Sequence, residues 1–434
     1  MVTTRDFRGF YILERGSSVS TKCLLFGIIN NDNTDDELRE LQALVESSGS
    51  YEVLGFVTQR RPQPEPRYYL GKGKMEALRD MVRDLEAELV VCDDELTPSQ
   101  QRNIAAFLET AVTDRTGIIL EIFAQRANTA EGKIQVELAQ LRYILPRLVG
   151  RGTELSRLGG GIGTRGPGET KLETDRRRVR QRIKELEREL DAITRHRDVT
   201  RRWRKQREVP VVSLVGYTNA GKSTLMAALT GSERVGDPRL FATLETTGRR
   251  VDLPGGGHFV LSDTVGFINK LPHQLVASFR ATLMEVKEAD LLLHVLDVST
   301  PGMEERIRTV EKVLAEIDDR PRLELKVYNK IDLLPPAEVE RLQLFLPEGI
   351  MVSAATGQGM PELLERIQEL LFEEATEITL NIPYSRGDLV NLLYDHSHVL
   401  QRKHLPSGVR LQVRGSRPLL ERVLQALNGE DAYE

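Results

Sequence analysis

The residues Gly216-Tyr217-Thr218-Asn219-Ala220-Gly221-Lys222-Ser223 decide the fold of this chain. An apolar, β-rich run (211–215) precedes them, and a run of good helix formers (224–229) follows. The order of strand, glycine loop and helix, with the spacing G-x-x-x-x-G-K-S, is typical of a phosphate-binding loop. Backbone N–H groups and the positive end of the helix dipole hold phosphates in such a loop. We therefore expect Lys222 to reach the β- and γ-phosphates and Ser223 to ligate Mg²⁺.

A second motif, Asp263-Thr264-Val265-Gly266, follows the predicted strand 259–262. At such a strand end a carboxylate can hold Mg²⁺ through a water molecule, and a glycine N–H can contact the γ-phosphate. The motif therefore predicts Asp263 as an indirect magnesium ligand and Gly266 as a contact to the γ-phosphate.

Two further motifs identify the base. They are Asn329-Lys330-Ile331-Asp332, after strand 325–328, and Ser353-Ala354-Ala355, after strand 350–352. The Asp332 carboxylate can accept hydrogen bonds from N1–H and the N2 amino group of guanine, whereas adenine would leave this acceptor unpaired. A backbone N–H of the 353–355 segment would lie near the guanine O6. Four motifs in this order, each at a strand end, predict a doubly wound GTP-binding domain over 208–373.

The segment between the first two motifs contains the candidate switch loop. Thr243 is the predicted ligand of Mg²⁺ and the γ-phosphate, 20 residues after Ser223, and Thr246 and Thr247 are the alternatives. The neighbours that we expect to contact the nucleotide are Phe241, Ala242, Leu244 and Glu245. GTP would keep this loop and the Asp263 loop in order, and hydrolysis would release both.

The predicted catalytic residues are Asn219, Lys222, Thr243 and Gly266. Phe267 occupies the position where well-known small GTPases carry a glutamine that orients water. A phenyl ring cannot orient water, so we expect slow hydrolysis unless a partner completes the site. The side-chain oxygen of Asn219 can ligate a monovalent cation such as K⁺; alternatively, Asn219 merely tolerates the backbone geometry of the loop.

Composition bounds the class of protein. The 434 residues are 40% hydrophobic and 29% charged, which is typical of a globular, multidomain chain. Cys23 and Cys92 both lie in apolar runs, which favours buried thiols in a reducing compartment. The apolar runs are too short to span a bilayer, and we expect a cytoplasmic protein. Although the net charge is −5, the segment 151–208 carries 18 Lys and Arg against 10 Asp and Glu, which favours a polyanionic partner.

Strands and helices alternate in the N-terminal part of the chain, which predicts an α/β domain with a largely parallel sheet over 21–126, after a loose tail at 1–20. The predicted strands are 22–29, 51–58 and 88–92, with 118–123 as a further candidate. The predicted helices are 35–47, 72–86 and 98–109.

Apolar residues then repeat in steps of three and four over 134–148 and again over 172–193. This spacing favours an antiparallel helical hairpin within 127–207, and the alternative is that both helices pack onto the α/β layer. The loop between them has six glycines in ten residues (159–168) and the cations Arg157, Arg165 and Lys171. We expect these cations to contact an RNA backbone, although a flexible linker is the plainer alternative.

Residues 374–434 predict a small C-terminal domain with strands 378–383 and 409–414 and helices 386–398 and 417–427. Histidines add little to the functional prediction. We expect His294 to be a core residue, and His396, His398 and His404 lack the neighbours that a metal site needs.

Nearly the whole chain resembles the HflX GTPases of the Obg-like, translation-associated group. The resemblance lies in the segments 69–74 (YLGKGK), 93–98 (DDELTP), 159–174, 240–244 (LFATL) and 263–267 (DTVGF). It implies a multidomain α/β protein: an N-terminal domain with a helical hairpin, a P-loop GTPase domain and a small α+β C-terminal domain. It also associates the N-terminal domain with adenine nucleotides, but Gly71-Lys72-Gly73-Lys74 lacks the spacing of a phosphate-binding loop.

The function that this resemblance implies is binding to the large (50S) ribosomal subunit and its rRNA. The GTP-bound form would split stalled 70S ribosomes, notably after heat stress. We expect Mg²⁺ as cofactor, GTP as substrate and K⁺ as an optional activator. We expect a monomer with neither a DNA partner nor a transmembrane segment, and peripheral membrane contact is left open. The alternative functions are an RNA-remodelling ATPase and a GTP-dependent adaptor for a protein partner.

Overall fold

The computed structural model describes eleven stretches of the chain and divides it into two compact units. The described residues are 20–29, 34–148, 167–206, 209–232, 240–241, 248–254, 256–270, 286–317, 322–371, 376–415 and 417–428. The first unit takes in residues 1–194 with two short later segments, 239–244 and 270–279. The second unit contains the remainder of the chain.

A four-stranded parallel sheet forms the centre of the first unit, in the order β2-β1-β3-β4. Its strands are β1 (Thr21–Ile29), β2 (Tyr51–Arg60), β3 (Leu89–Cys92) and β4 (Ala111–Asp114). The helices that alternate with them are α1 (Thr34–Ser47), α2 (Lys72–Asp84), α3 (Pro98–Leu108) and α4 (Arg115–Arg126). The predicted alternation is confirmed, and both cysteines are buried in this sheet as free thiols.

The prediction of a strand at 118–123 is wrong, because these residues lie in α4 and the fourth strand is β4. Asp114 caps the helix by accepting a hydrogen bond from the Gly117 N–H at 2.9 Å. Residues 118–120 and 122–123 are all buried, so burial on several sides produced the continuous apolar run that resembled a strand.

A buried charge cluster follows β3. The Asp93 carboxylate pairs with the guanidinium of Arg115 at 2.6 Å, and Arg115 also pairs with Glu40. The ammonium of Lys270, from the later segment of this unit, pairs with Asp93 and lies 2.8 Å from Asp94. Burial lowers the pKa of Lys270, but the charges of Asp93 and Asp94 outweigh it, and the net shift is upward.

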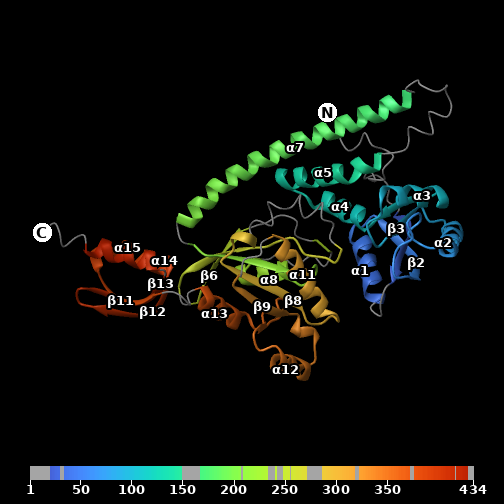
Figure 1. Ribbon diagram of the computed structural model, residues 1–434. Coiled ribbons are helices and arrows are strands. Elements are labelled where there is room, and N and C mark those ends of the chain that lie inside the picture. The colour runs from blue at the N-terminus through green and yellow to red at the C-terminus, as the bar shows by residue number, and fades with distance from the viewer. Residues whose placement is uncertain are drawn as a thin grey trace. The chain divides into compact units, whose positions relative to one another are not determined.

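The two predicted hairpin helices pack against each other. They are α5 (Ala130–Ile144), continued by a 3₁₀ turn at Leu145–Leu148, and α7 (Pro167–Gln206), whose last residues count with the second unit. Figure 1 shows α7 running back alongside α5. Their seam buries Leu138, Leu141, Val179 and Leu186, and Arg182 pairs with Glu137 at 2.8 Å across it. The glycine-rich loop lies outside the described residues.

A six-stranded sheet with the order β10-β9-β8-β5-β7-β6 forms the centre of the second unit. Its strands are β5 (Val211–Gly216), β6 (Gly248–Asp252), β7 (His258–Ser262), β8 (Leu291–Asp297), β9 (Glu324–Asn329) and β10 (Ile350–Met351). All pairs are parallel except β6 with β7. The helices are α8 (Lys222–Thr230), α11 (Met303–Ile317), α12 (Pro336–Phe345) and α13 (Met360–Leu371). This is the predicted doubly wound arrangement.

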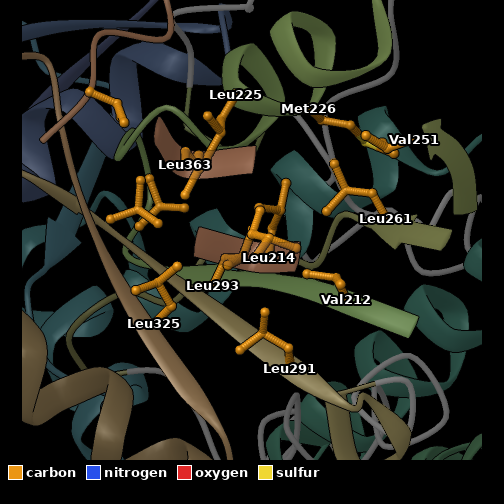
Figure 2. Close-up of a cluster of buried hydrophobic side chains, with 14 of the residues drawn as sticks. Val212, Leu214, Leu225, Met226, Val251, Leu261, Leu291, Leu293, Leu325 and Leu363 are labelled. Carbon is orange, nitrogen blue, oxygen red and sulfur yellow. The ribbon is translucent and has the colours of Figure 1, made fainter. Parts of the chain in front are cut away.

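Side chains from one face of this sheet pack with α8 and α13 in a hydrophobic core. Figure 2 shows Leu214 and Leu293, from neighbouring strands, among leucines from α8 and α13. His294 is fully buried on β8, as predicted, with Nδ1 2.9 Å from a carboxylate oxygen of Glu324. A rigid sheet of this kind holds the loops at its carboxyl edge in fixed positions.

The C-terminal part of the second unit is a separate three-stranded antiparallel sheet with the order β11-β13-β12. Its strands are β11 (Thr376–Pro383), β12 (His398–Leu405) and β13 (Gly408–Gly415), and its helices are α14 (Gly387–His396) and α15 (Arg417–Asn428). The predicted helix 386–398 ends at His396, and β12 is a strand that the sequence did not predict. This strand is polar and mostly exposed, so it lacks the alternation that reveals a strand.

Two features are absent from the described residues. No cluster of His, Cys, Asp or Glu suited to a metal ion occurs among them. None of the described helices is long and apolar enough to cross a bilayer.

Candidate nucleotide-binding site

The carboxyl edge of the six-stranded sheet gathers the four predicted motifs. The loop 216–223 follows β5, and the 263–266 motif follows β7. The 329–332 motif follows β9, and the 353–355 segment follows β10. Because these strands are parallel, their carboxyl ends meet at one edge, which is where ligands of doubly wound folds bind.

Two glycines are required by the geometry of the phosphate-binding loop. Gly216 has φ +151°, and a Cβ there would lie 2.3 Å from the carbonyl oxygen of Val295. Gly221 has φ +94°, and a Cβ there would lie 2.2 Å from Nδ2 of Asn329. Asn219 also adopts a positive φ, +61°, which asparagine tolerates better than most residues. The loop therefore wraps closely around the first turn of α8, whose free N–H groups can hold an anion.

Lys222 is 6% exposed at the start of α8. Its ammonium donates hydrogen bonds to the carbonyl oxygens of Gly216, at 3.0 Å, and Tyr217, at 2.8 Å. Burial lowers the pKa of Lys222 to about 8, although the negative charge of Asp263 opposes the shift. A cation poised in this way is stabilised by an incoming phosphate, because an opposite charge favours the protonated form.

The residues expected to hold Mg²⁺ lie together. The Ser223 hydroxyl donates a hydrogen bond of 3.0 Å to Oδ2 of Asp263, and the Thr264 N–H donates one of 2.9 Å to Oδ1. A hydroxyl beside a carboxylate fits Mg²⁺, which takes oxygen ligands and retains several waters. A Cβ on Gly266 would lie 3.1 Å from the Lys222 ammonium, so this glycine brings its backbone close to the lysine.

Asn329 connects three of the motifs through one buried amide. Its side chain is 2% exposed; Nδ2 donates to the carbonyl of Ala220 at 2.9 Å, and Oδ1 accepts from the Ala354 N–H at 3.0 Å. The phosphate loop and the 353–355 segment are therefore fixed by the same residue. Asp332 is exposed on the short 3₁₀ turn Ile331–Leu333, where a carboxylate can receive a base.

The structure also gives a role to Asp297, which the sequence analysis missed. This residue ends β8, is 9% exposed, and its Oδ2 accepts a hydrogen bond of 2.7 Å from the Lys330 ammonium. Its other oxygen accepts from the N–H of Ser299 at 2.9 Å. A charged residue directly after a run that is apolar except for His294 (291–296) was the signal available in the sequence.

Tyr217 and Phe267 link the phosphate loop to the segment after β7, and the sequence did not predict these contacts. The Tyr217 hydroxyl accepts a hydrogen bond of 2.7 Å from the Asn269 N–H. Phe267 is 2% exposed; its N–H donates to Gly216 and its carbonyl accepts from Thr218, at 3.1 and 2.7 Å. The Phe267 side chain is therefore a core residue, and the Phe267 backbone holds the 263–266 motif against the phosphate loop.

The predicted site residues fall into three groups. Those of the second unit's motifs that are buried are Gly216, Tyr217, Thr218, Ala220, Lys222, Asp263, Thr264, Val265, Gly266, Asn329, Ile331, Ser353 and Ala354, and Ala355 is exposed. Phe241 belongs to the first unit, where its ring packs edge-to-face on Phe123 at 4.7 Å. Residues outside the described ranges are Ala242, Thr243, Leu244, Glu245, Arg157 and Arg165, and only the helical backbone of Lys171 is described.

Comparison with known proteins identifies the family. Two family models named GTP-binding GTPase N-terminal and GTP-binding GTPase Middle Region match residues 35–124 and 126–204. A third, 50S ribosome-binding GTPase, matches 211–330, and the HflX C-terminal domain matches 346–425. The chain is 46% identical to GTPase HflX of Caldanaerobacter subterraneus over 93% of its own length and 92% of the relative's. The chain belongs to the HflX GTPase family.

A second HflX relative agrees. GTPase HflX of Escherichia coli is 45% identical over 88% of this chain and 90% of the relative. A GDP complex of a GTP-binding protein from the archaeon Sulfolobus solfataricus aligns with 27% identity and a TM-score of 0.41, covering 82% of this chain and 99% of the other. Like its HflX relatives, this chain is a GTPase, with a GTPase domain of the ribosome-binding class.

Proposed function

We propose that this protein is a ribosome-associated GTPase that binds the large subunit and, in its GTP state, dissociates stalled or stressed 70S ribosomes. The observation that carries the proposal is the match of residues 211–330 to a 50S ribosome-binding GTPase domain, on the fold that gathers the four motifs at one edge. A ribosomal partner implies work in the cytoplasm. The protein would act there as a monomer, and a single sedimentation coefficient at all concentrations would test that state.

The nucleotide site has a role for each predicted residue. Lys222 and the backbone of 216–221 would hold the β- and γ-phosphates, Gly266 and Thr243 would contact the γ-phosphate, and Asp332 would read guanine. Ser223 and Thr243 would ligate Mg²⁺ directly, and Asp263 through water. When bound, Mg²⁺ neutralises charge that develops on the phosphates. The 3.0 Å hydrogen bond from Ser223 to Asp263 supports this assignment, since it shows that two oxygen atoms suited to ligate Mg²⁺ lie next to each other.

Hydrolysis without the ribosome would be slow, because Phe267 is a buried core residue that offers no group to orient water. Asn219 would supply an oxygen to K⁺, and the competing explanation is that it only accommodates φ +61°. Asn219→Gly separates these explanations, since glycine keeps the backbone conformation and removes the oxygen. Rates in KCl and NaCl should differ for the native protein and coincide for the variant. A native rate that is equal in both salts excludes the cation.

Ribosome binding would use the basic loop and α7. Arg177, Arg180 and Lys184 are exposed on α7, away from the seam at Val179 and Leu186, so cations flank the loop on the helix that leaves it. Together with Arg157, Arg165 and Lys171 they would contact phosphates of structured rRNA.

Sedimentation with 70S ribosomes and isolated subunits, in GDP and in a non-hydrolysable GTP analogue, tests the function. We expect co-sedimentation with the large subunit in the analogue, and conversion of 70S particles into subunits. Arg165→Ala/Lys171→Ala should weaken binding and reduce its salt dependence while GTP affinity is retained. Arg308→Ala/Lys312→Ala on α11 removes two exposed cations elsewhere and serves as the control. Binding equal to that of the control pair would reject the loop as the contact. Binding to a protein other than the ribosome would favour the adaptor function.

A further inference from the structure

The C-terminal sheet has one covered face and one open face. Leu380 and Ile382 of β11 and Leu411 of β13 are buried, in a core shared with α14 and α15. Figure 1 shows both helices on the same side of the sheet. Alternate residues of the same strands point the other way and are exposed or half-buried. We call this second surface the outer face.

The outer face carries three rows of side chains across the strands. The rows, read from β11 through β13 to β12, are Glu377, Arg414 and His398; then Thr379, Gln412 and Gln401; then Asn381, Arg410 and Lys403. Apart from Glu377, which pairs with Arg414 at 3.2 Å, these side chains are cationic, amide, imidazole or hydroxyl groups. A solvated antiparallel face normally mixes charges of both signs in its cross-strand pairs.

Two cationic side chains instead stand directly opposite each other. Lys403 is the cross-strand partner of Arg410, and neither makes an ion pair with any described residue. Arg410 donates one hydrogen bond of 2.9 Å, to the neutral Asn381. In the neighbouring pair, by contrast, Arg414 is paired with Glu377, and burial and then the charge of Arg414 lower the pKa of His398, which favours its neutral form. Like charges in directly opposed positions destabilise a sheet, so an anion placed between them would relieve the repulsion.

An aromatic ring borders the same end of the sheet. Tyr384 follows β11 directly and is 57% exposed. Its hydroxyl donates to the carbonyl of Leu405 at 3.1 Å, which fixes the ring beside the end of β12. The Lys403 and Arg410 row is the row of the outer face nearest to this end. The Tyr384 hydroxyl also lies 3.4 Å from Nδ1 of His404, whose cross-strand partner Val409 is buried under the helices. The ring therefore borders the covered side, and the outer face offers its cations to phosphates.

We infer that the outer face of the C-terminal sheet is an RNA-binding surface, with Lys403 and Arg410 on the phosphate backbone. The amide row of Gln401 and Gln412 offers hydrogen-bond donors and acceptors for base edges and 2′-hydroxyl groups. An acidic protein segment would use the cations and leave these amides without a role. The inference rests on the proposed function only in that the ribosome supplies the RNA.

The test uses the full chain with GDP and a labelled single-stranded 20-nucleotide RNA, with the dissociation constant measured from low to moderate KCl. For Lys403→Gln/Arg410→Gln, the slope of log affinity against log salt should become shallower by about 1.4, since each single-strand phosphate contact contributes about 0.7. The same two contacts correspond to an affinity loss of about 25-fold at 0.1 M salt. Tyr384→Ala removes a ring whose hydroxyl contacts His404 on the covered side, and it should leave both the affinity and the slope unchanged.

Arg402→Gln is the matched control for Lys403→Gln. It removes one charge from the adjacent position, but its guanidinium lies over the Tyr394 ring of α14, on the covered side. We expect Lys403→Gln to change the slope and Arg402→Gln to leave it unchanged. Equal slopes for the double variant and the native protein would overturn the inference, as would displacement of the RNA by polyglutamate at equal charge. If the thermal stability of the double variant is unchanged or higher, misfolding is excluded as the cause of a loss of RNA affinity. Loss of oligonucleotide binding with ribosome sedimentation intact separates this surface from the proposed function.

Discussion

The contact between Gly221 and Asn329 allows a quantitative prediction for Gly221→Ala. The new Cβ would lie 2.2 Å from Nδ2 of Asn329, far inside van der Waals contact, and the residue would retain φ +94°. Asn329 is 2% exposed and bonded at both ends of its amide, so it cannot turn aside without losing the bonds to Ala220 and Ala354.

The expected cost has two parts. A left-handed conformation costs an L-residue about 1–2 kcal/mol. Disrupting the hydrogen bonds of a buried amide costs about 1–3 kcal/mol. The sum, about 2–5 kcal/mol, corresponds to a loss of GDP affinity of roughly 30-fold to 4,000-fold. Displacement titration with a fluorescent GDP analogue measures it.

Gly231→Ala is the matched control, since it shares the left-handed backbone but not the clash. Gly231 has φ +63° at the end of α8, and a Cβ there meets nothing within 4 Å. We expect a small loss of stability and an unchanged GDP affinity. In the Asn329→Ala background, Gly221→Ala should reduce the GDP affinity by less than it does in the native protein, because the side chain with which its Cβ clashes has been removed. Affinity within threefold of the native protein, or full additivity in the double variant, would refute the reasoning.

Three further perturbations follow from other contacts. Asp332→Asn should abolish the preference for guanine over adenine nucleotides in competition binding; a retained preference would mean another residue reads the base. Burial raises the pKa of Glu121 above its usual value of 4.5. The folded state therefore holds this proton more tightly than the unfolded state does, and stability is lost as the pH rises from 4.5 through the raised pKa. Glu121→Gln, which still accepts from Tyr51, should therefore raise the melting temperature at pH 8 but not near pH 4; equal gains at both would contradict this. Lys270→Met should destabilise the first unit by about 1–3 kcal/mol, measured by calorimetry, because Asp93 loses a charged partner. Lys270→Arg keeps the positive charge and should retain most of the native stability.

The sequence predicted the phosphate loop well because its geometry is local. Glycines at 216 and 221, with a strand before and a helix after, determine the backbone without help from distant residues. The seam of the hairpin was equally readable, because its spacing repeats in both helices. Family membership followed from motifs of this local kind.

Long-range pairing is what the sequence could not supply. Nothing near Asn329 indicates that its amide bonds to Ala220, 109 residues earlier, and Lys270 is 177 residues from Asp93. Two assignments failed for opposite reasons. Residues 118–123 were predicted as a strand because burial on several sides made the helix continuously apolar, and β12 was not predicted because its exposure leaves it polar. The Thr243 assignment and the cations of the glycine-rich loop remain predictions.

The Lys222 ammonium, with its pKa lowered to about 8, makes phosphate binding a proton-coupled event. Near pH 8 a sizeable fraction of the protein holds a neutral amine, and an arriving phosphate restores its proton because the added negative charge raises the pKa. Nucleotide capture therefore draws a proton from solution, and affinity weakens as the medium becomes more alkaline than pH 8. Calorimetric titrations in buffers that differ in ionisation enthalpy would register this proton directly. The pH of the medium therefore affects how much of the protein holds nucleotide, independently of any partner.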